Sequence, residues 1–173
     1  MRLMFMDEAR FGRINRPARC WAPPGVRPVI GCQVVREYTY AYTAVSPVDG
    51  ASCSLILPTM QTECFGAFLA VLGARFPDEL VVMICDGAGS HSAGELHVPE
   101  NIRLISLPPY SPELNPVEQV WALLRERYFA NKIMGSMADV QAVLVKALNW
   151  LAQATGTLQT LTHRAWATTP QTA

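Results

Sequence analysis

An uninterrupted run of apolar residues, LVVMIC, lies near the middle of the chain and leads directly into Asp86. The run has the length of one buried strand and falls far short of the roughly 18 apolar residues of a membrane span. A strand without polar residues at alternate positions is covered on both faces, which is typical of a sheet between two layers of helices. The run therefore predicts the central strand of a layered α/β domain.

The segments around this run extend the same pattern. The stretch EYTYAYTAVS places tyrosines on one face and threonine or alanine on the other, a period of two that indicates a strand. Ser136, followed three residues later by Asp139, is typical of a helix start. Strands are expected over 2–7, 28–35, 37–46, 52–57, 79–86 and 101–107, a turn over 47–50, a loop or irregular hairpin over 10–28, and helices over 62–75, 115–131 and 137–154. We therefore predict an α/β fold whose mixed sheet joins an antiparallel meander to parallel strands and is flanked by helices.

Length and composition favour one soluble domain. The chain has 173 residues, half of them hydrophobic and 16% charged, so residues 1–173 are expected to form a single domain with one substantial core. The five cysteines are scattered and form no C-x-x-C pair, which argues against a zinc site or a disulfide framework. The N-terminus lacks the pattern of a signal peptide. We expect a cytoplasmic protein without a membrane partner.

Charge is distributed unevenly although the formal net charge is zero. Residues 1–36 carry seven arginines against two acidic residues, a balance of +5, and the remaining residues carry the compensating −5. Arginine has the planar fork that suits phosphate oxygens. The first four arginines after the acidic pair Asp7 and Glu8 are therefore candidates for contacts with nucleic-acid phosphates, with a solvated loop as the alternative: Arg10, Arg13, Arg16 and Arg19.

Three carboxylates occupy positions from which a ligand site could be built. Asp7 and Asp86 are each expected at the end of a strand, and ligands of α/β sheets bind beyond the carboxyl ends of the strands. The neighbouring Glu8 would point to the opposite face of its strand, so we favour Asp7. Each aspartate could instead be a turn former. Glu118 is expected in the first turn of a helix.

The segment before Glu118, PPYSPELNP, contains four prolines and should deliver the helix start to a defined place. Asn115 and Glu118 also have the spacing of a capping box, so Glu118 could be a cap only. Trp121 and Leu124 are expected in the core. Three clustered carboxylates would repel one another unless cations neutralise them, and hard oxygen ligands suit Mg²⁺ or Mn²⁺. Two such ions could serve phosphodiester displacement.

Four motifs, FMDEARFG, WAPPGVRP, ICDGAGSHSA and LPPYSPELNPVEQVW, resemble in this order the DDE endonuclease domain of mariner-type transposases, in the branch found in bacterial insertion sequences. The resemblance covers roughly residues 1–150. It implies a ribonuclease H-like fold, two divalent metal ions (Mg²⁺ or Mn²⁺), and catalytic, metal-binding roles for Asp7, Asp86 and Glu118. His91 matches the histidine after the second aspartate, which implies a place near the metal or the DNA, whereas a surface or capping role is the alternative.

The resemblance implies cleavage and transfer of DNA strands during cut-and-paste transposition of an insertion sequence. The implied partners are the DNA of the element ends and target, further copies of the same chain, and a separate helix-turn-helix polypeptide. We expect the N-terminal helix-turn-helix region of the family to be absent, because only six residues precede Asp7. The alternatives are a folded but inactive remnant that binds DNA or dimerises, and a stand-alone ribonuclease H-like nuclease; the proline-rich motif favours the transposase.

Overall fold

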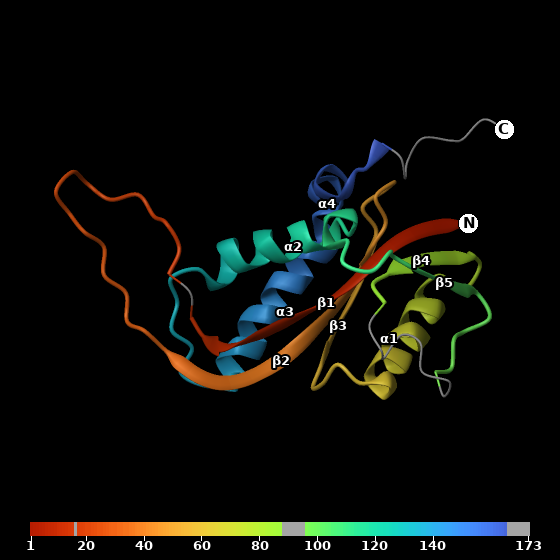
Figure 1. Ribbon diagram of the computed structural model, residues 1–173, viewed down its shortest axis with the longest axis horizontal. Helices are drawn as coiled ribbons and strands as arrows, with labels where there is room; N and C mark the ends of the chain where they lie inside the picture. The colour runs from red at the N-terminus through yellow and green to blue at the C-terminus, as the bar shows by residue number, and fades with distance from the viewer. Residues whose placement is uncertain (16, 88–95, 166–173) are drawn as a thin grey trace.

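A mixed five-stranded sheet forms the centre of the protein in this computed structural model, which describes residues 1–15, 17–87 and 96–165 (Figure 1). The order across the sheet is β3-β2-β1-β4-β5. The β1–β2 and β2–β3 pairs are antiparallel, and the β1–β4 and β4–β5 pairs are parallel. This arrangement confirms the predicted α/β fold with an antiparallel meander and parallel strands. The strands are β1 (Arg2–Ile14), β2 (Val34–Val45), β3 (Ser52–Leu57), β4 (Val81–Cys85) and β5 (Ile102–Ser106).

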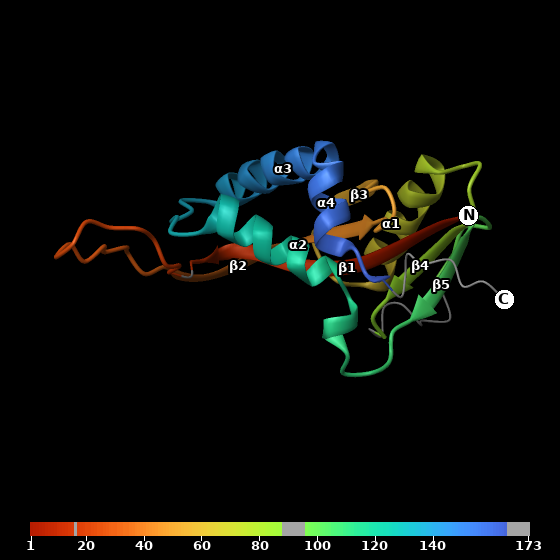
Figure 2. The ribbon, with the colours of Figure 1, turned by 90° about the horizontal axis from the view of Figure 1, so that it is seen from above.

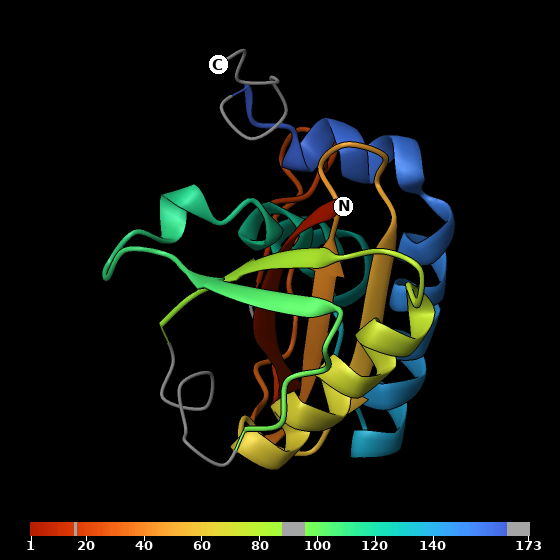
Figure 3. The ribbon, with the colours of Figure 1, turned by 90° about the vertical axis from the view of Figure 1, so that its right-hand side faces the viewer.

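Helices cover both faces of the sheet, as the all-apolar β4 predicted. One face packs against α1, and the other packs against α2, α3 and α4 (Figures 2 and 3). The described helices are α1 (Thr62–Arg75), the 3-10 helix η2 (Pro112–Leu114), α2 (Val117–Leu124), the π-helical turn η3 (Arg125–Phe129), α3 (Met137–Gln153) and α4 (Thr155–Thr162). None of these helices is both long and apolar enough to cross a membrane.

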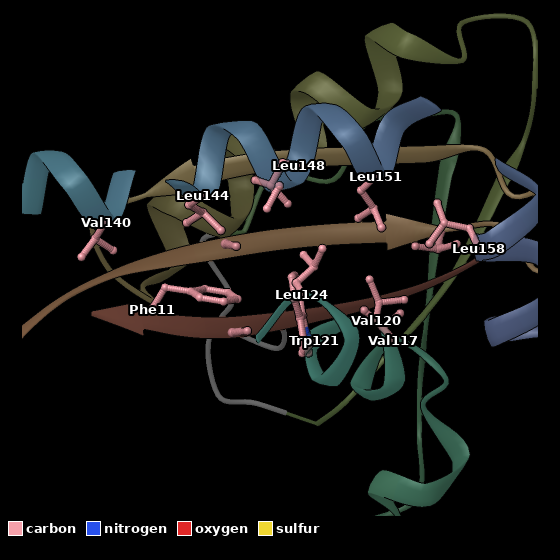
Figure 4. Packing of buried hydrophobic residues seen from close by; sticks show 14 of the residues in the cluster. Phe11, Val117, Val120, Trp121, Leu124, Val140, Leu144, Leu148, Leu151 and Leu158 are labelled. Atoms are coloured by element: carbon pink, nitrogen blue, oxygen red, sulfur yellow. The ribbon is translucent and has the colours of Figure 1, made fainter. Parts of the chain in front are cut away.

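Strand β1 divides its side chains between two cores because successive residues of a strand point to opposite faces. Met4 and Met6 join the cluster under α1, whereas Phe5, Ala9 and Phe11 join the cluster under α2 and α3. Figure 4 shows the second cluster, in which leucines of α3 and the apolar stripe of α2 meet the sheet. This alternation decides which residues of β1 face helix α2.

Several predicted boundaries were wrong, most importantly the end of the first strand at Asp7. The strand continues to Ile14 because β2 remains paired with it as far as the Ile14–Val34 register, so its backbone groups keep partners. The parallel partner β4 stops earlier, with the Phe5–Ile84 register. The predicted strand over 28–35 is also wrong, since β2 begins at Val34. Residues 17–33 form an exposed loop that extends from the sheet (Figure 1).

The helices agree better with the sequence. Helix α1 has the predicted bounds, the predicted turn over 47–50 is present, and α3 begins with the predicted capping box of Ser136 and Asp139. The helix predicted over 115–131 is shorter: it begins at Val117, and its last turn widens into η3. Four residues carry the buried stripe of α2, and they include the two expected in the core: Val117, Val120, Trp121 and Leu124.

Candidate active site

Asp7 lies inside β1, at the point where the strand has lost its parallel partner but still pairs with β2. By the alternation of the strand it shares the face of Phe5 and Ala9, toward helix α2. Its side chain is only 8% exposed. The indole Nε1 of Trp121 donates a hydrogen bond of 2.8 Å to its Oδ2 atom. The first candidate carboxylate is therefore buried and held from the helix side.

Asp86 directly follows Cys85, the last residue of β4, and its side chain is exposed. The carbonyl of Cys85 accepts a hydrogen bond from the backbone N–H of Leu107, 2.8 Å away, so the end of β4 remains tied to the chain leaving β5. Because β1 and β4 are parallel neighbours, Asp86 comes off the same end of the sheet at which Asp7 loses its β4 partner. That end is where ligands of α/β sheets bind.

Glu118 lies in the first turn of α2 and is exposed. The predicted capping box with Asn115 was wrong. Pro116 occupies the N-cap position, and the side chain of Asn115 accepts from the N–H of Val117 instead, at 3.2 Å. The backbone N–H of Glu118 donates to the backbone carbonyl of Asn115 at 3.3 Å. The interpretation of Glu118 as a cap only therefore loses its main support.

The carboxylates act on one another electrostatically. The pKa of Asp7 is raised from 3.8 to about 7, first by burial and second by repulsion from Glu118, with smaller contributions from Glu8 and Asp86. The hydrogen bond from Trp121 lowers the pKa but does not cancel these effects. A buried carboxylate among other carboxylates gains stability from a proton or from a cation.

The chemistry of this donor set fits a divalent cation, because carboxylate oxygens are the ligands that Mg²⁺ and Mn²⁺ prefer. The cation would also relieve the repulsion that raises the pKa of Asp7. No group of three His, Cys, Asp or Glu side chains within the described residues is already arranged as a metal centre. The fit therefore rests on the repulsion that Glu118 and Asp86 exert on Asp7, and on the end of the sheet from which Asp7 and Asp86 both come.

The candidate nucleic-acid contacts are only partly described. The guanidinium of Arg10 lies over the ring of Tyr38, 4.4 Å from its centroid, and Arg19 is exposed in the loop over 17–33. Arg13 is engaged: it bonds Glu37 at 2.8 Å and the Met134 carbonyl at 3.0 Å. Arg16 and His91 lie outside the described residues.

A cleft of about 490 Å³ adjoins Arg10 and Arg13. Arg10 and Arg13 line it from β1, while Arg125 and Lys132 line it from η3 and the segment after it. Local sequence patterns do not place the last two cations beside Arg10 and Arg13, because they are more than a hundred residues away in the chain. The meeting of β1 with the end of α2 brings them together.

Two residues near the carboxylates make contacts that local sequence patterns do not predict. Trp121 was expected only in the core, and Asn115 only as a cap. Trp121 also bonds Asp7, and the Nδ2 atom of Asn115 donates to the Met6 carbonyl at 2.9 Å. One signal was available, since a buried indole N–H usually has a hydrogen-bond partner.

A family model and one relative each match most of this chain. The family model described as DDE superfamily endonuclease matches residues 2–141. The uncharacterized protein y4pE/y4sA of Sinorhizobium fredii (strain NBRC 101917 / NGR234) is 37% identical over 131 residues, which are 75% of this chain and 97% of that protein.

Among solved structures, the Mos1 transposase paired-end complex with the left transposon end is similar with a TM-score of 0.63 and 17% identity, covering 92% of this chain and 52% of that one. The catalytic domain of Mos1 mariner transposase gives a TM-score of 0.58 at 14% identity, covering 92% of this chain and 78% of that one. This chain thus spans about half the length of the transposase in the complex. The likeness shows a ribonuclease H-like fold.

Proposed function

The chain belongs to the DDE superfamily of endonucleases, and we propose that it is the catalytic domain of a DDE transposase. In this proposal it cleaves and transfers DNA strands during cut-and-paste transposition of an insertion sequence. The observation that carries the proposal is that Asp7 is buried within reach of other carboxylates: burial first, repulsion from Glu118 second and a smaller repulsion from Asp86 raise its pKa to about 7. Perturbed carboxylates at the ligand-binding end of an α/β sheet are typical of functional sites.

Asp7, Asp86 and Glu118 would hold two Mg²⁺ or Mn²⁺ ions. When bound, such ions activate the attacking oxygen and stabilise the leaving oxygen of a phosphodiester displacement. The protein's own part is to place the three carboxylates: Asp7 is fixed from α2 by Trp121, and Asp86 extends from the end of the neighbouring strand. The burial of Asp7 keeps bulk water from one side of the site.

The reaction proposed has two displacements at phosphorus. In the first, a water oxygen bonds to the phosphorus at the element end and the bond to the 3′ oxygen breaks, leaving a 3′-OH and a 5′-phosphate. In the second, that 3′ oxygen attacks a phosphorus of target DNA and displaces the target's 3′ oxygen. The proton lost by each attacking oxygen is balanced by the proton taken up by the leaving oxygen. Both steps need an in-line arrangement, so the placement of the carboxylates matters more than their basicity.

DNA is the proposed partner. The arginines of the first 36 residues and the cleft lined by Arg10, Arg125 and Lys132 support this proposal, because clustered cations at a polyanion supply most of the sequence-independent affinity. Assembly of several copies and a helix-turn-helix segment for recognition of the element ends also belong to the proposal. The Mos1 complex, which contains a transposon end, is a precedent within the same fold.

The test replaces Glu118 by Gln, which keeps the size of the side chain but removes its charge. The protein, joined to a helix-turn-helix domain that binds the element end, is given end DNA with Mn²⁺, and the released strands are resolved on a denaturing gel. We expect Glu118→Gln to lose at least about 100-fold of the cleavage rate, since even indirect partners of metal ligands are worth 10- to 100-fold. Thermal unfolding should change little.

Glu113→Gln is the matched control, because Glu113 is also an exposed glutamate, five residues earlier in η2. It should cleave like the wild type. Equal cleavage by Glu118→Gln and the wild type would show that the catalytic assignment is wrong. A wild-type protein that binds end DNA but never cleaves it would favour the inactive remnant over the transposase.

A further inference from the structure

Asn115, Glu118 and Trp121 follow one another at intervals of three residues at the start of α2. Asn115 has an extended backbone just before the helix, Glu118 lies in the first turn of α2, and Trp121 lies three residues further along the same helix, so Glu118 lies between the other two along the chain. Both flanking residues are buried, with exposed fractions of 4% for Asn115 and 1% for Trp121. Both donate hydrogen bonds to strand β1, and the two acceptors belong to consecutive residues, Met6 and Asp7.

The bond from Asn115 fixes the backbone beside Asp7. Its Nδ2 atom donates to the carbonyl of Met6, 2.9 Å away, and this carbonyl belongs to the peptide bond that joins Met6 to Asp7. Its Oδ1 atom accepts from the N–H of Val117, the first residue of α2. One amide therefore connects the peptide before Asp7 to the first turn of the helix that carries Glu118.

The bond from Trp121 fixes the side chain of Asp7. The indole Nε1 lies 2.8 Å from Oδ2, and the ring is itself held by an edge-to-face contact with Phe11, whose centroid is 5.9 Å away. Phe11 lies on the same face of β1, four residues after Asp7. Figure 4 shows Trp121 between α2 and the sheet, beside Leu124 and Val120. The ring has little freedom to move away from the carboxylate.

We propose that Asn115 and Trp121 are positioning residues that set the place of Asp7 relative to Glu118. The proposal rests on the proposed function, in which these two carboxylates bind the same ions. A slide or rotation of α2 along β1 would have to break both bonds, because one lies before Glu118 and the other after it. Outer partners of this kind are worth 10- to 100-fold in metal affinity.

A purely structural role is the competing explanation. A buried indole or amide needs partners, and Asp7 and Met6 would then serve only to satisfy Trp121 and Asn115. Within the described residues no buried side-chain nitrogen or oxygen lacks a hydrogen-bond partner. The presence of these two hydrogen bonds therefore does not by itself distinguish a positioning role from a purely structural one. The affinity of the folded protein for a cation does separate them.

The experiment measures the dissociation constant of Mn²⁺ by electron paramagnetic resonance, which detects the free ion. Trp121→Phe keeps a buried ring but removes the donor to Asp7, and Asn115→Ser keeps an oxygen for the helix start but removes the amide that reaches Met6. We expect each change to weaken Mn²⁺ binding by 10- to 100-fold. Trp150→Phe is the control, because Trp150 packs against the same core cluster from α3 and contacts the Tyr128 ring and the Arg127 guanidinium there.

Each variant is titrated below its own midpoint of thermal unfolding, and if one of the two does not fold, the other decides. Dissociation constants for Trp121→Phe and Asn115→Ser within twofold of that for Trp150→Phe would overturn the positioning role while leaving the proposed function intact. Asp7→Asn is titrated in parallel. If that change leaves the wild-type binding of Mn²⁺ unaltered, the metal site of the proposed function is wrong, and the positioning role falls with it.

Discussion

Replacement of Asp7 by Asn should make the metal-free protein more stable at neutral and alkaline pH. Burial and the repulsion from Glu118 raise the pKa of Asp7 to about 7 in the folded state, against 3.8 for an unperturbed aspartate. An asparagine has no charge to bury, and its side-chain oxygen can still accept the hydrogen bond of Trp121. The change therefore removes the electrostatic cost and keeps the contact.

The magnitude follows from the two pKa values. Below about pH 4 Asp7 is protonated in both the folded and the unfolded state, and its contribution to stability is fully present. Between about pH 4 and pH 7 the unfolded state ionises while the folded state keeps its proton, so stability falls by about 1.4 kcal/mol per pH unit. Above pH 7 the loss is complete and amounts to roughly 4 kcal/mol, from about three pH units at that slope.

The assay is urea unfolding in a chelating buffer at several pH values from about 5 to 8. The free energy of unfolding should fall with pH more steeply in the wild type than in Asp7→Asn, and the two proteins should differ by a few kcal/mol at pH 8. Asp78→Asn, a change of an exposed aspartate, should follow the wild type. Parallel pH dependences for the wild type and Asp7→Asn would refute the raised pKa. Added Mn²⁺ should stabilise the wild type and Asp78→Asn but not Asp7→Asn.

Three further changes test other parts of the protein. Ser136→Ala should cost about 1 kcal/mol in urea unfolding, because it removes the cap that accepts from Asp139 N–H at 3.2 Å; Ser106→Ala is a control outside any helix start. Gly50→Ala should cost at least about 1–2 kcal/mol, since Gly50 has a φ of 71° and an added Cβ would meet the backbone of Thr155; an unchanged unfolding midpoint would contradict this. Replacement of all four candidate arginines (Arg10, Arg13, Arg16 and Arg19) by Gln should reduce the slope of log affinity for DNA against log salt by about 3 to 4, at roughly 0.9 per phosphate contact, whereas Arg103→Gln on β5 should leave the slope unchanged.

Local patterns were enough to predict the fold class. The all-apolar run of β4 predicted a strand covered on both faces, and the alternation of Tyr40 and Tyr42 with Ala41 matches their division between the two cores. The end of β1 could not be predicted in this way. Glycine and arginine after Asp7 suggested a loop, but pairing with β2 keeps the backbone hydrogen-bonded as far as Ile14. A partner strand twenty residues away overrides local propensity.

The candidate active site, like the end of β1, could be predicted only in part from local sequence patterns. Asp7, Asp86 and Glu118 could be selected from strand ends, a proline-braced helix start and the resemblance to a known family. The residues that hold these carboxylates in place could not be selected from the sequence, because the hydrogen bond from Trp121 to Asp7 joins residues 114 positions apart. Asn115 shows the limit most clearly: its type and position predicted a cap, yet one of its two side-chain hydrogen bonds reaches across to β1. Contacts between distant segments are set by tertiary packing.

The arrangement around Asp7 links metal binding to folding. The fold buries Asp7 on the α2 face and brings other carboxylates near it, so the ionised site is destabilising at neutral pH in the absence of a cation. A cation that binds only the folded state adds RT ln(1 + [L]/Kd), which is about 2.7 kcal/mol at a hundredfold excess over Kd. That gain is of the same order as the cost of ionising Asp7. The hydrogen bonds from Trp121 and Asn115 keep Asp7 in place against this repulsion. A carboxylate that was free to rotate would relieve the repulsion by moving away from Glu118, and no preformed site for the ion would remain.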